Sequence, residues 1–141
     1  MESFPRVLAT AIGVQVSCQI FKTVYYSIRD RRVSLRYLVT AGGVPSAHVA
    51  FVTALTVAIG FQSGIASDGF AVAVVFGSIV AFDAYRLRGQ VQRQAQIINR
   101  RLLVPTGAQP VSEMVGHSVS EVVAGILVGG GLSAVASLVL R

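Results

Sequence analysis

The chain has 141 residues, of which 53% are apolar and 13% are charged, and its mean hydropathy is +0.68. Water-soluble domains usually carry about 25% charged residues, so this composition argues against a soluble enzyme and, because the chain is strongly apolar, against disorder. The net charge of +6 comes from basic residues that lie between apolar blocks, which is typical of membrane proteins and not of nucleic-acid-binding proteins. The single cysteine, Cys18, excludes a disulfide framework. The sequence therefore predicts one integral membrane domain over residues 1–141.

Four apolar segments predict membrane-spanning helices, at residues 7–28, 45–61, 69–82 and 119–140. A helix needs roughly 20 apolar residues to cross a bilayer, within a range of about 17 to 25. The first and last segments reach this length, whereas the two middle segments need flanking residues to do so. We expect an all-α fold, a polytopic transmembrane helical bundle of about four spans.

The connector before the last span predicts a further, amphipathic helix. Its apolar residues recur at a spacing of three or four and oppose a polar side: Leu87, Val91, Ala95 and Ile98 against Arg88, Gln92, Arg93, Gln96 and Asn99. This pattern is typical of an interfacial helix at the membrane surface, and Pro105 and Pro110 end it.

The last predicted span contains a pair of glycines, Gly125 and Gly129, at a spacing of four. Small residues at this spacing let another helix approach closely within a membrane. We expect the pair to support helix packing, either inside the bundle or in a homodimer.

Arginine is distributed unequally among the connectors. The first connector contains Arg29, Arg31, Arg32 and Arg36, and the third contains Arg86, Arg88, Arg93, Arg100 and Arg101. The second connector, residues 62–68, contains no basic residue. Because cytoplasmic loops carry an excess of Lys and Arg, we expect the first and third connectors to face the cytoplasm.

Ionisable and other polar residues gather at the cytoplasmic ends of the predicted spans. In chain order they are Lys22, Arg29, Pro45, Ser46, His48, Asp83, Arg88, His117 and Glu121. A charged side chain near the centre of a span costs about 2.5 kcal/mol or more, so spans keep such groups where they pair or line a cavity. We expect these residues to meet in one site that faces the cytoplasm.

These residue types suit phosphoryl transfer from a lipid. The cationic side chains can clamp a phosphate, and the backbone N–H groups at a helix start near Ser46 favour an anion. Two histidines can supply a nucleophile and a general acid. Glu121 lies four residues after His117, so its carboxylate can hold that imidazole.

Each residue also has a purely structural explanation. Cationic side chains at span ends can extend to lipid headgroups, and Ser46 can act as a helix cap alone. Asp83 can pair with Arg86 or Arg88 without any further role. Both kinds of explanation stay open at this point for each residue taken singly.

Three ordered motifs extend over most of the chain. They are Gly-Gly-Val-Pro-Ser-Ala-His at 42–48, then Asp83-Ala84 with Arg88, Gln94-Ala95 and Asn99, and finally Gly116-His117-Ser118 with Glu121-Val122 and Gly125. Together they resemble the divergent branch of the type 2 phosphatidic acid phosphatase superfamily, also described as acid phosphatase/vanadium-dependent haloperoxidase-related. The first motif is similar to the Gly-Gly-Met-Pro-Ser-Ser-His of that branch.

The resemblance implies a phosphatase that works through a phosphohistidine and needs no metal or other cofactor. It implies that His117 is the nucleophile, that Glu121 orients it, and that His48 protonates the leaving alcohol. The residues that match phosphate-binding positions are Lys22, Arg29 and Ser46, and those that match supporting positions are Pro45, Asp83 and Asn99.

The chain departs from the wider superfamily at several motif positions. Asp30 follows Arg29 where the superfamily has proline, and Ala47 replaces a glycine. Pro110 and Val111 occupy the positions of a Ser-Arg pair, so one phosphate ligand is missing. We expect Arg88 to supply the missing cation. A divalent metal held by Asp83, Glu113, His117 and Glu121 is the less favoured alternative.

The sequence thus predicts a membrane phosphatase that acts on a lipid phosphate monoester or a prenyl pyrophosphate. The alternative is a non-catalytic protein that binds or transports a lipid phosphate and retains the same pocket. A third hypothesis is a purely structural membrane subunit.

Overall fold

The computed structural model describes residues 6–33, 35–38, 42–106, 110–113 and 115–139. These residues form helices and no strand, which confirms the all-α expectation for this part of the chain. The elements are α1 (Arg6–Arg29), η1 (Leu35–Leu38), α2 (Ala47–Ser63), α3 (Asp68–Tyr85), α4 (Leu87–Thr106) and α5 (Val119–Val139).

Three helical stretches are long and apolar enough to cross a membrane: α1, α3 with the part of α4 up to Arg101, and α5. The fourth apolar helix, α2, has 17 residues, which is about 26 Å of helix against a hydrocarbon core of about 30 Å. The polytopic helical bundle is therefore confirmed, with α2 as its shortest member.

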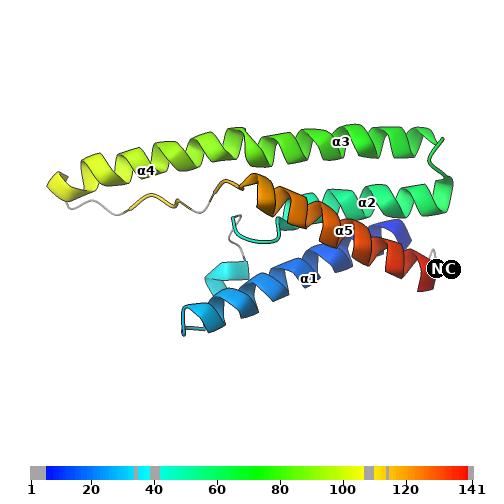
Figure 1. Ribbon diagram of the computed structural model, residues 1–141, viewed down its shortest axis with the longest axis horizontal. Coiled ribbons are helices and arrows are strands. Elements are labelled where there is room, and N and C mark those ends of the chain that lie inside the picture. The colour runs from blue at the N-terminus through cyan, green and yellow to red at the C-terminus, as the bar shows by residue number, and fades with distance from the viewer. Residues whose placement is uncertain (1–5, 34, 39–41, 107–109, 114, 140–141) are drawn as a thin grey trace, which may run out of the picture.

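The four apolar helices run antiparallel to their chain neighbours, and α2 lies among the other three (Figure 1). One end of the bundle holds the start of α1, the connection from α2 to α3, and the end of α5. The other end holds the last turn of α1, the first turns of α2 and α5, and the end of α3, with the last turn of α1 set apart from the other three (Figure 1). Every polar segment that the sequence assigned to one site lies at this second end, which we call the site end.

Small residues bring α2 and α5 into close contact. A Cβ atom on Gly125 would lie 2.7 Å from the Ser46 carbonyl oxygen, and one on Gly129 would collide with the Ala50 carbonyl oxygen. One turn further, the Ser133 hydroxyl donates a hydrogen bond of 2.8 Å to the Ala54 carbonyl. The predicted packing role of the glycine pair is thus confirmed, and the partner helix lies inside the bundle.

The predicted amphipathic helix is present as α4, and it continues the direction of α3 beyond the rest of the bundle (Figure 1). The chain then returns alongside α4 to the start of α5. This return segment (residues 110–113 and 115–118) is tied to α4 by the Asn99 side chain. Asn99 accepts from the Val111 N–H at 2.9 Å and donates to the Val111 carbonyl at 2.9 Å and to Glu113 Oε1 at 2.6 Å.

We expect Asn99→Ala to loosen the return segment without unfolding the bundle. The substitution removes hydrogen bonds that each contribute about 0.5–1.5 kcal/mol, at an exposed position. Hydrogen–deuterium exchange should rise at residues 110–113 by about tenfold, while α2 and α5 remain protected. Unchanged exchange in this segment would show that other contacts hold it.

Candidate functional site

The first turn of α2 presents unused hydrogen-bonding groups at the site end. Ser46 is the N-cap residue and is fully buried, yet its hydroxyl makes no capping bond and has no partner among the described residues. The first intrahelical bond runs from the Ala50 N–H to the Ser46 carbonyl, so the N–H groups of residues 47–49 have no acceptor within the helix. A buried hydroxyl and a helix N-terminus together favour an anion.

Glu121 holds His117 in a defined orientation at the start of α5. Glu121 Oε2 lies 2.9 Å from His117 Nδ1 and also accepts the Ser118 N–H at 3.2 Å. The Ser118 hydroxyl accepts the Glu121 N–H in return, so the two residues form a capping box. Because an ionised carboxylate only accepts hydrogen bonds, Nδ1 must carry the proton. The lone pair of His117 then lies on Nε2, a buried atom with no partner in the described part of the chain.

The same start of α5 also fixes the cap residue of α2. The Ser46 N–H donates to the Glu121 carbonyl at 3.1 Å, and Gly125 packs directly on Ser46. One residue, Glu121, therefore contacts both motifs: its backbone holds Ser46 and its side chain holds His117. This arrangement explains how two motifs that are about 70 residues apart in the chain come together.

His117 approaches the site along the junction of α3 and α4. Its N–H donates to the Ala84 carbonyl at 3.2 Å, and the Gly116 N–H donates to Gln92 Oε1 at 3.1 Å. A Cβ atom on Gly116 would lie 2.9 Å from the Arg88 carbonyl oxygen, so only glycine lets the segment lie so close to α4.

The charged residues of three other elements converge on the two histidines. His48 lies within electrostatic reach of Lys22, Asp83, Arg88 and His117. Lys22 and Arg88 act on His117 as well, and Glu121 acts on Lys22. Lys22 is 1% exposed although its side chain ends in an amino group, and Arg88 Nε bonds to Asp83 Oδ2 at 2.8 Å. The structure thus places these side chains within electrostatic reach of one another at the site end.

Arg29 lies apart from this cluster. Its Nε bonds to Asp30 Oδ1 at 2.8 Å, and its guanidinium carbon lies 4.6 Å above the Tyr26 ring. Its side chain is 56% exposed, and the groups that act on it electrostatically are Asp30, Tyr25 and Tyr26, which include neither histidine. In this conformation Arg29 lies at the rim of the site end.

Tyr26 supports the turn that leads into α2. Its hydroxyl accepts the Val44 N–H at 3.3 Å and would lie 2.5 Å from a Cβ atom on Gly43. Gly43 has a φ of +96°, which side-chain-bearing residues rarely adopt. Pro45, which follows a cis peptide bond, is buried beside Ser46. The turn therefore needs glycine both for its backbone conformation and for space.

The alternative metal site is not assembled. Within the described ranges no three His, Cys, Asp or Glu side chains come together. Asp83 is paired with Arg88, and Glu113 accepts from Asn99 on the outer part of α4. Asn99, a supporting residue in the sequence prediction, positions the return segment through its hydrogen bonds to Val111 and Glu113.

Burial sets the charge state of His117. Burial lowers the pKa of His117 from its usual 6.5, and the bonded Glu121 carboxylate partly opposes this by raising it, while Lys22 and Arg88 lower it further. The lowered pKa favours the neutral imidazole.

Comparison with known proteins identifies the family of the chain. A model of the Divergent PAP2 family matches residues 5–132. The chain belongs to the Divergent PAP2 family. The uncharacterized membrane protein YuiD of Bacillus subtilis (strain 168) is 29% identical to it over 145 residues, which cover 92% of this chain and 90% of YuiD. No solved structure matches the chain. The family model includes all of the residues placed here at the site end, from Lys22 to Gly125.

Three positioning residues of this Divergent PAP2 protein were missed by the sequence analysis. Ser118 could have been found, because Ser-x-x-Glu before an apolar run is the pattern of a capping box. Gln92 and Tyr26 gave no local signal, because each bonds to a backbone group 18 or more residues away along the chain.

Proposed function

We propose that this protein hydrolyses a phosphate monoester or pyrophosphate of a membrane lipid through a phosphohistidine at His117. The observation that carries the proposal is the state of the His117 ring. Nδ1 is held by Glu121, and Nε2 is buried with its lone pair unused; the Ser46 hydroxyl and His48 Nδ1 are likewise buried without a partner among the described residues. A buried polar atom without a partner costs about 1–3 kcal/mol, so its persistence is typical of a site that binds a ligand.

The reaction needs two displacements. In the first, Nε2 of His117 attacks phosphorus, the bond from phosphorus to the lipid oxygen breaks, and His48 protonates the departing oxygen. In the second, a water molecule attacks the phosphohistidine, His48 accepts a water proton, and the bond from phosphorus to Nε2 breaks. Inorganic phosphate and the lipid alcohol are the products. When the substrate is a prenyl pyrophosphate, the products are inorganic phosphate and the prenyl monophosphate.

Several groups near the histidines suit a phosphate dianion. Lys22 supplies a buried cation, and the Ser46 hydroxyl with the N–H groups of the first turn of α2 supplies donors. Val111 replaces the arginine of the superfamily motif, and its backbone is bonded to Asn99. Arg88 acts electrostatically on both histidines, so we assign it the missing cationic role.

The site is proposed to face the cytoplasm. The connectors at the site end carry nine of the chain's arginines, whereas residues 62–68 at the opposite end carry none. A cysteine-directed, membrane-impermeant reagent tests this orientation. Ser112→Cys at the site end should be labelled only after the cell membrane is opened, and labelling in intact cells would contradict the orientation.

The proposal is tested with protein purified in detergent. Phosphatidate, phosphatidylglycerophosphate and prenyl pyrophosphates are each supplied, and phosphate release is measured together with acid-labile labelling of the protein by ³²P. We expect release from at least one lipid and a labelled phosphohistidine. Saturable binding of a lipid phosphate without release or labelling would instead identify the protein as a non-catalytic binder.

We expect Glu121→Gln to slow phosphate release and to shift its pH dependence. The rate should fall by on the order of a hundredfold, because a neutral amide does not stabilise the positive charge on the imidazole ring while Nε2 is bonded to phosphorus. Glu121 raises the pKa of His117, so its loss lowers that pKa and moves the acid limb of the pH–rate profile to lower pH. Glutamine still fits the capping box, so the melting temperature should stay within a few degrees. An acid limb that moves upward would contradict this assignment.

A further inference from the structure

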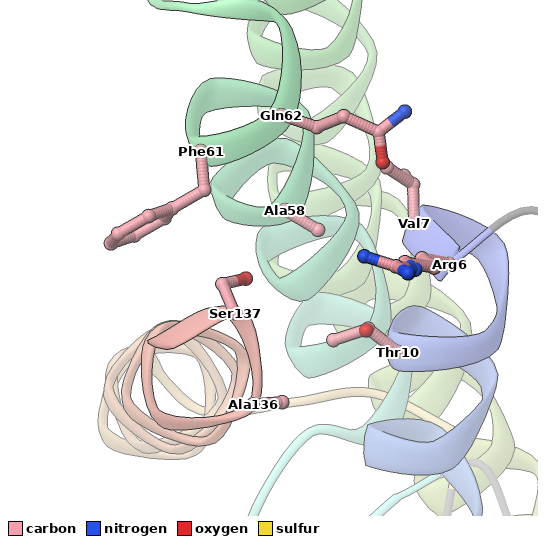
Figure 2. A pocket seen from close by; sticks show the side chains of 8 residues that line it. All are labelled: Arg6, Val7, Thr10, Ala58, Phe61, Gln62, Ala136 and Ser137. Carbon is pink, nitrogen blue, oxygen red and sulfur yellow. The ribbon is translucent and has the colours of Figure 1, made fainter. Parts of the chain in front are cut away.

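A continuous apolar groove extends from the site end along the bundle between α1 and α5. These two helices each pack mainly on α2 and contact one another much less. Two adjoining cavities of about 280 and 400 Å³ share Ser17 and Leu132 and lie in this gap. A third cavity shares Arg6, Thr10 and Ala136 with the second one and forms the far mouth, where side chains of α1, α2 and α5 surround it (Figure 2).

One end of this groove adjoins the proposed phosphate site. The first cavity is lined by Cys18 and Pro45. Cys18 is one helical turn before Lys22 on the same buried face of α1, and Pro45 directly precedes Ser46. A molecule whose phosphate lies between Lys22 and Ser46 therefore has the mouth of the groove next to it.

The groove walls suit a hydrocarbon chain and not a polar headgroup. Phe21, Val14, Val128 and Leu132 line the first two cavities. Phe21 is 55% exposed and Leu132 is 44% exposed, so the groove is open along its side to the surrounding lipid. A chain could therefore enter from the bilayer without passing through the bundle.

The length of the groove fits one lipid chain. Arg6 and Cys18 are twelve residues apart on α1, which is about 18 Å of helix, whereas one leaflet of the hydrocarbon core is about 15 Å thick.

We propose that the α1–α5 groove binds one hydrocarbon chain of the substrate lipid, with its phosphate at the His117 site. This inference rests on the proposed function for the position of the phosphate. It predicts that a lipid with a single long chain is sufficient as a substrate, and that any second chain stays in the bilayer.

Two matched glycines allow a test by mutation. Gly13 lines the groove, and a Cβ atom on it would have nothing within 4 Å, so we expect the side chain of Gly13→Leu to enter the groove. Gly131 on α5 is equally open but does not line the groove, so Gly131→Leu is the control. We expect Gly13→Leu to lower the ratio of kcat/KM for a long-chain alkyl phosphate to that for a short-chain one by about tenfold, and Gly131→Leu to leave that ratio unchanged.

Tryptophan fluorescence gives a readout that does not depend on hydrolysis. The chain contains no tryptophan, so Leu132→Trp reports from the groove and Leu127→Trp from the outer face of α5. A non-hydrolysable alkyl phosphonate with a brominated chain should quench Leu132→Trp at least about threefold more than Leu127→Trp. Brominated phosphatidylcholine, which represents bulk lipid, should quench both to a similar extent.

The outcomes separate the groove from the catalytic proposal. Absence of phosphate release from every substrate would overturn the proposed function, and the quenching experiment would still decide whether the groove holds the chain. Equal quenching at both positions by the phosphonate would overturn the groove proposal whatever the hydrolysis data show. A change of oligomeric state in Gly13→Leu alone, with an unchanged substrate ratio, would show that a second copy of the chain occupies the groove, and would also overturn it.

Discussion

Replacing His117 with alanine should lower phosphate release from the best lipid substrate by at least about a thousandfold and abolish ³²P labelling of the protein. The imidazole is the group that both attacks phosphorus and carries it between the two displacements. Its Nδ1 is held by Glu121 and its Nε2 has no other partner among the described residues, so the substitution removes the nitrogen that the proposed mechanism uses as nucleophile. Release and labelling are measured on the same preparation in detergent.

His48→Ala distinguishes the two histidines. A general acid matters less when the leaving group is a weak base, so an aryl phosphate should recover much of the lost rate of the first step in His48→Ala but none in His117→Ala. Leu127→Ala, on the lipid-facing side of α5 with its side chain 70% exposed, controls for general effects of substitution. Parental rates in both histidine variants would show that the proposed mechanism is wrong.

Gly129→Leu should be the most damaging single substitution in the bundle. Its Cβ would collide with the carbonyl oxygen and Cα of Ala50, which are backbone atoms and cannot rotate away. Overpacking usually costs about 1–3 kcal/mol, and the absence of a flexible neighbour places this substitution at or above the upper end. We expect a melting temperature lowered by 5 °C or more, on the order given by about 3 kcal/mol for a chain of this size, and loss of monodisperse protein on size-exclusion chromatography.

Gly131→Leu is the matched control, because a Cβ atom on this glycine, two residues away on α5, would have nothing within 4 Å. Its melting temperature should equal that of the parent or exceed it slightly, since glycine is a poorer helix former than leucine. Similar losses in both variants would mean that glycine at these positions serves the backbone of α5 and not its contact with α2.

The sequence was sufficient to predict the helices and the site end because both depend on local pattern. Apolar length predicted the spans, and the spacing of Gly125 and Gly129 predicted a close helix contact, which α2 supplies. The site residues follow from where the spans end, since an antiparallel bundle brings alternate helix ends to one face.

What the sequence did not predict depends on contacts between distant residues. The direction of α4 is set by the junction at Arg86, where the backbone remains nearly helical and no Gly or Pro turns the chain. Arg29 has the spacing of a phosphate ligand, but its side chain bonds to Asp30 instead. Asp30 is in turn held by Tyr37, whose hydroxyl donates to it at 2.6 Å. The role of Arg29 in phosphate binding therefore stays a prediction.

The two histidines are attached to the protein in different ways. His48 belongs to α2, which packs against α1, α3 and α5. Moving α2 away from these helices would expose a large apolar area. His117 lies in the return segment. Hydrogen bonds with Asn99, Gln92 and the Ala84 carbonyl hold this segment to α4 and the end of α3. Glu121 holds the His117 ring from α5, but the backbone that leads to His117 is held by α4. Under the proposed mechanism, damage to α4 far from the phosphate would therefore act on the chemistry through the return segment.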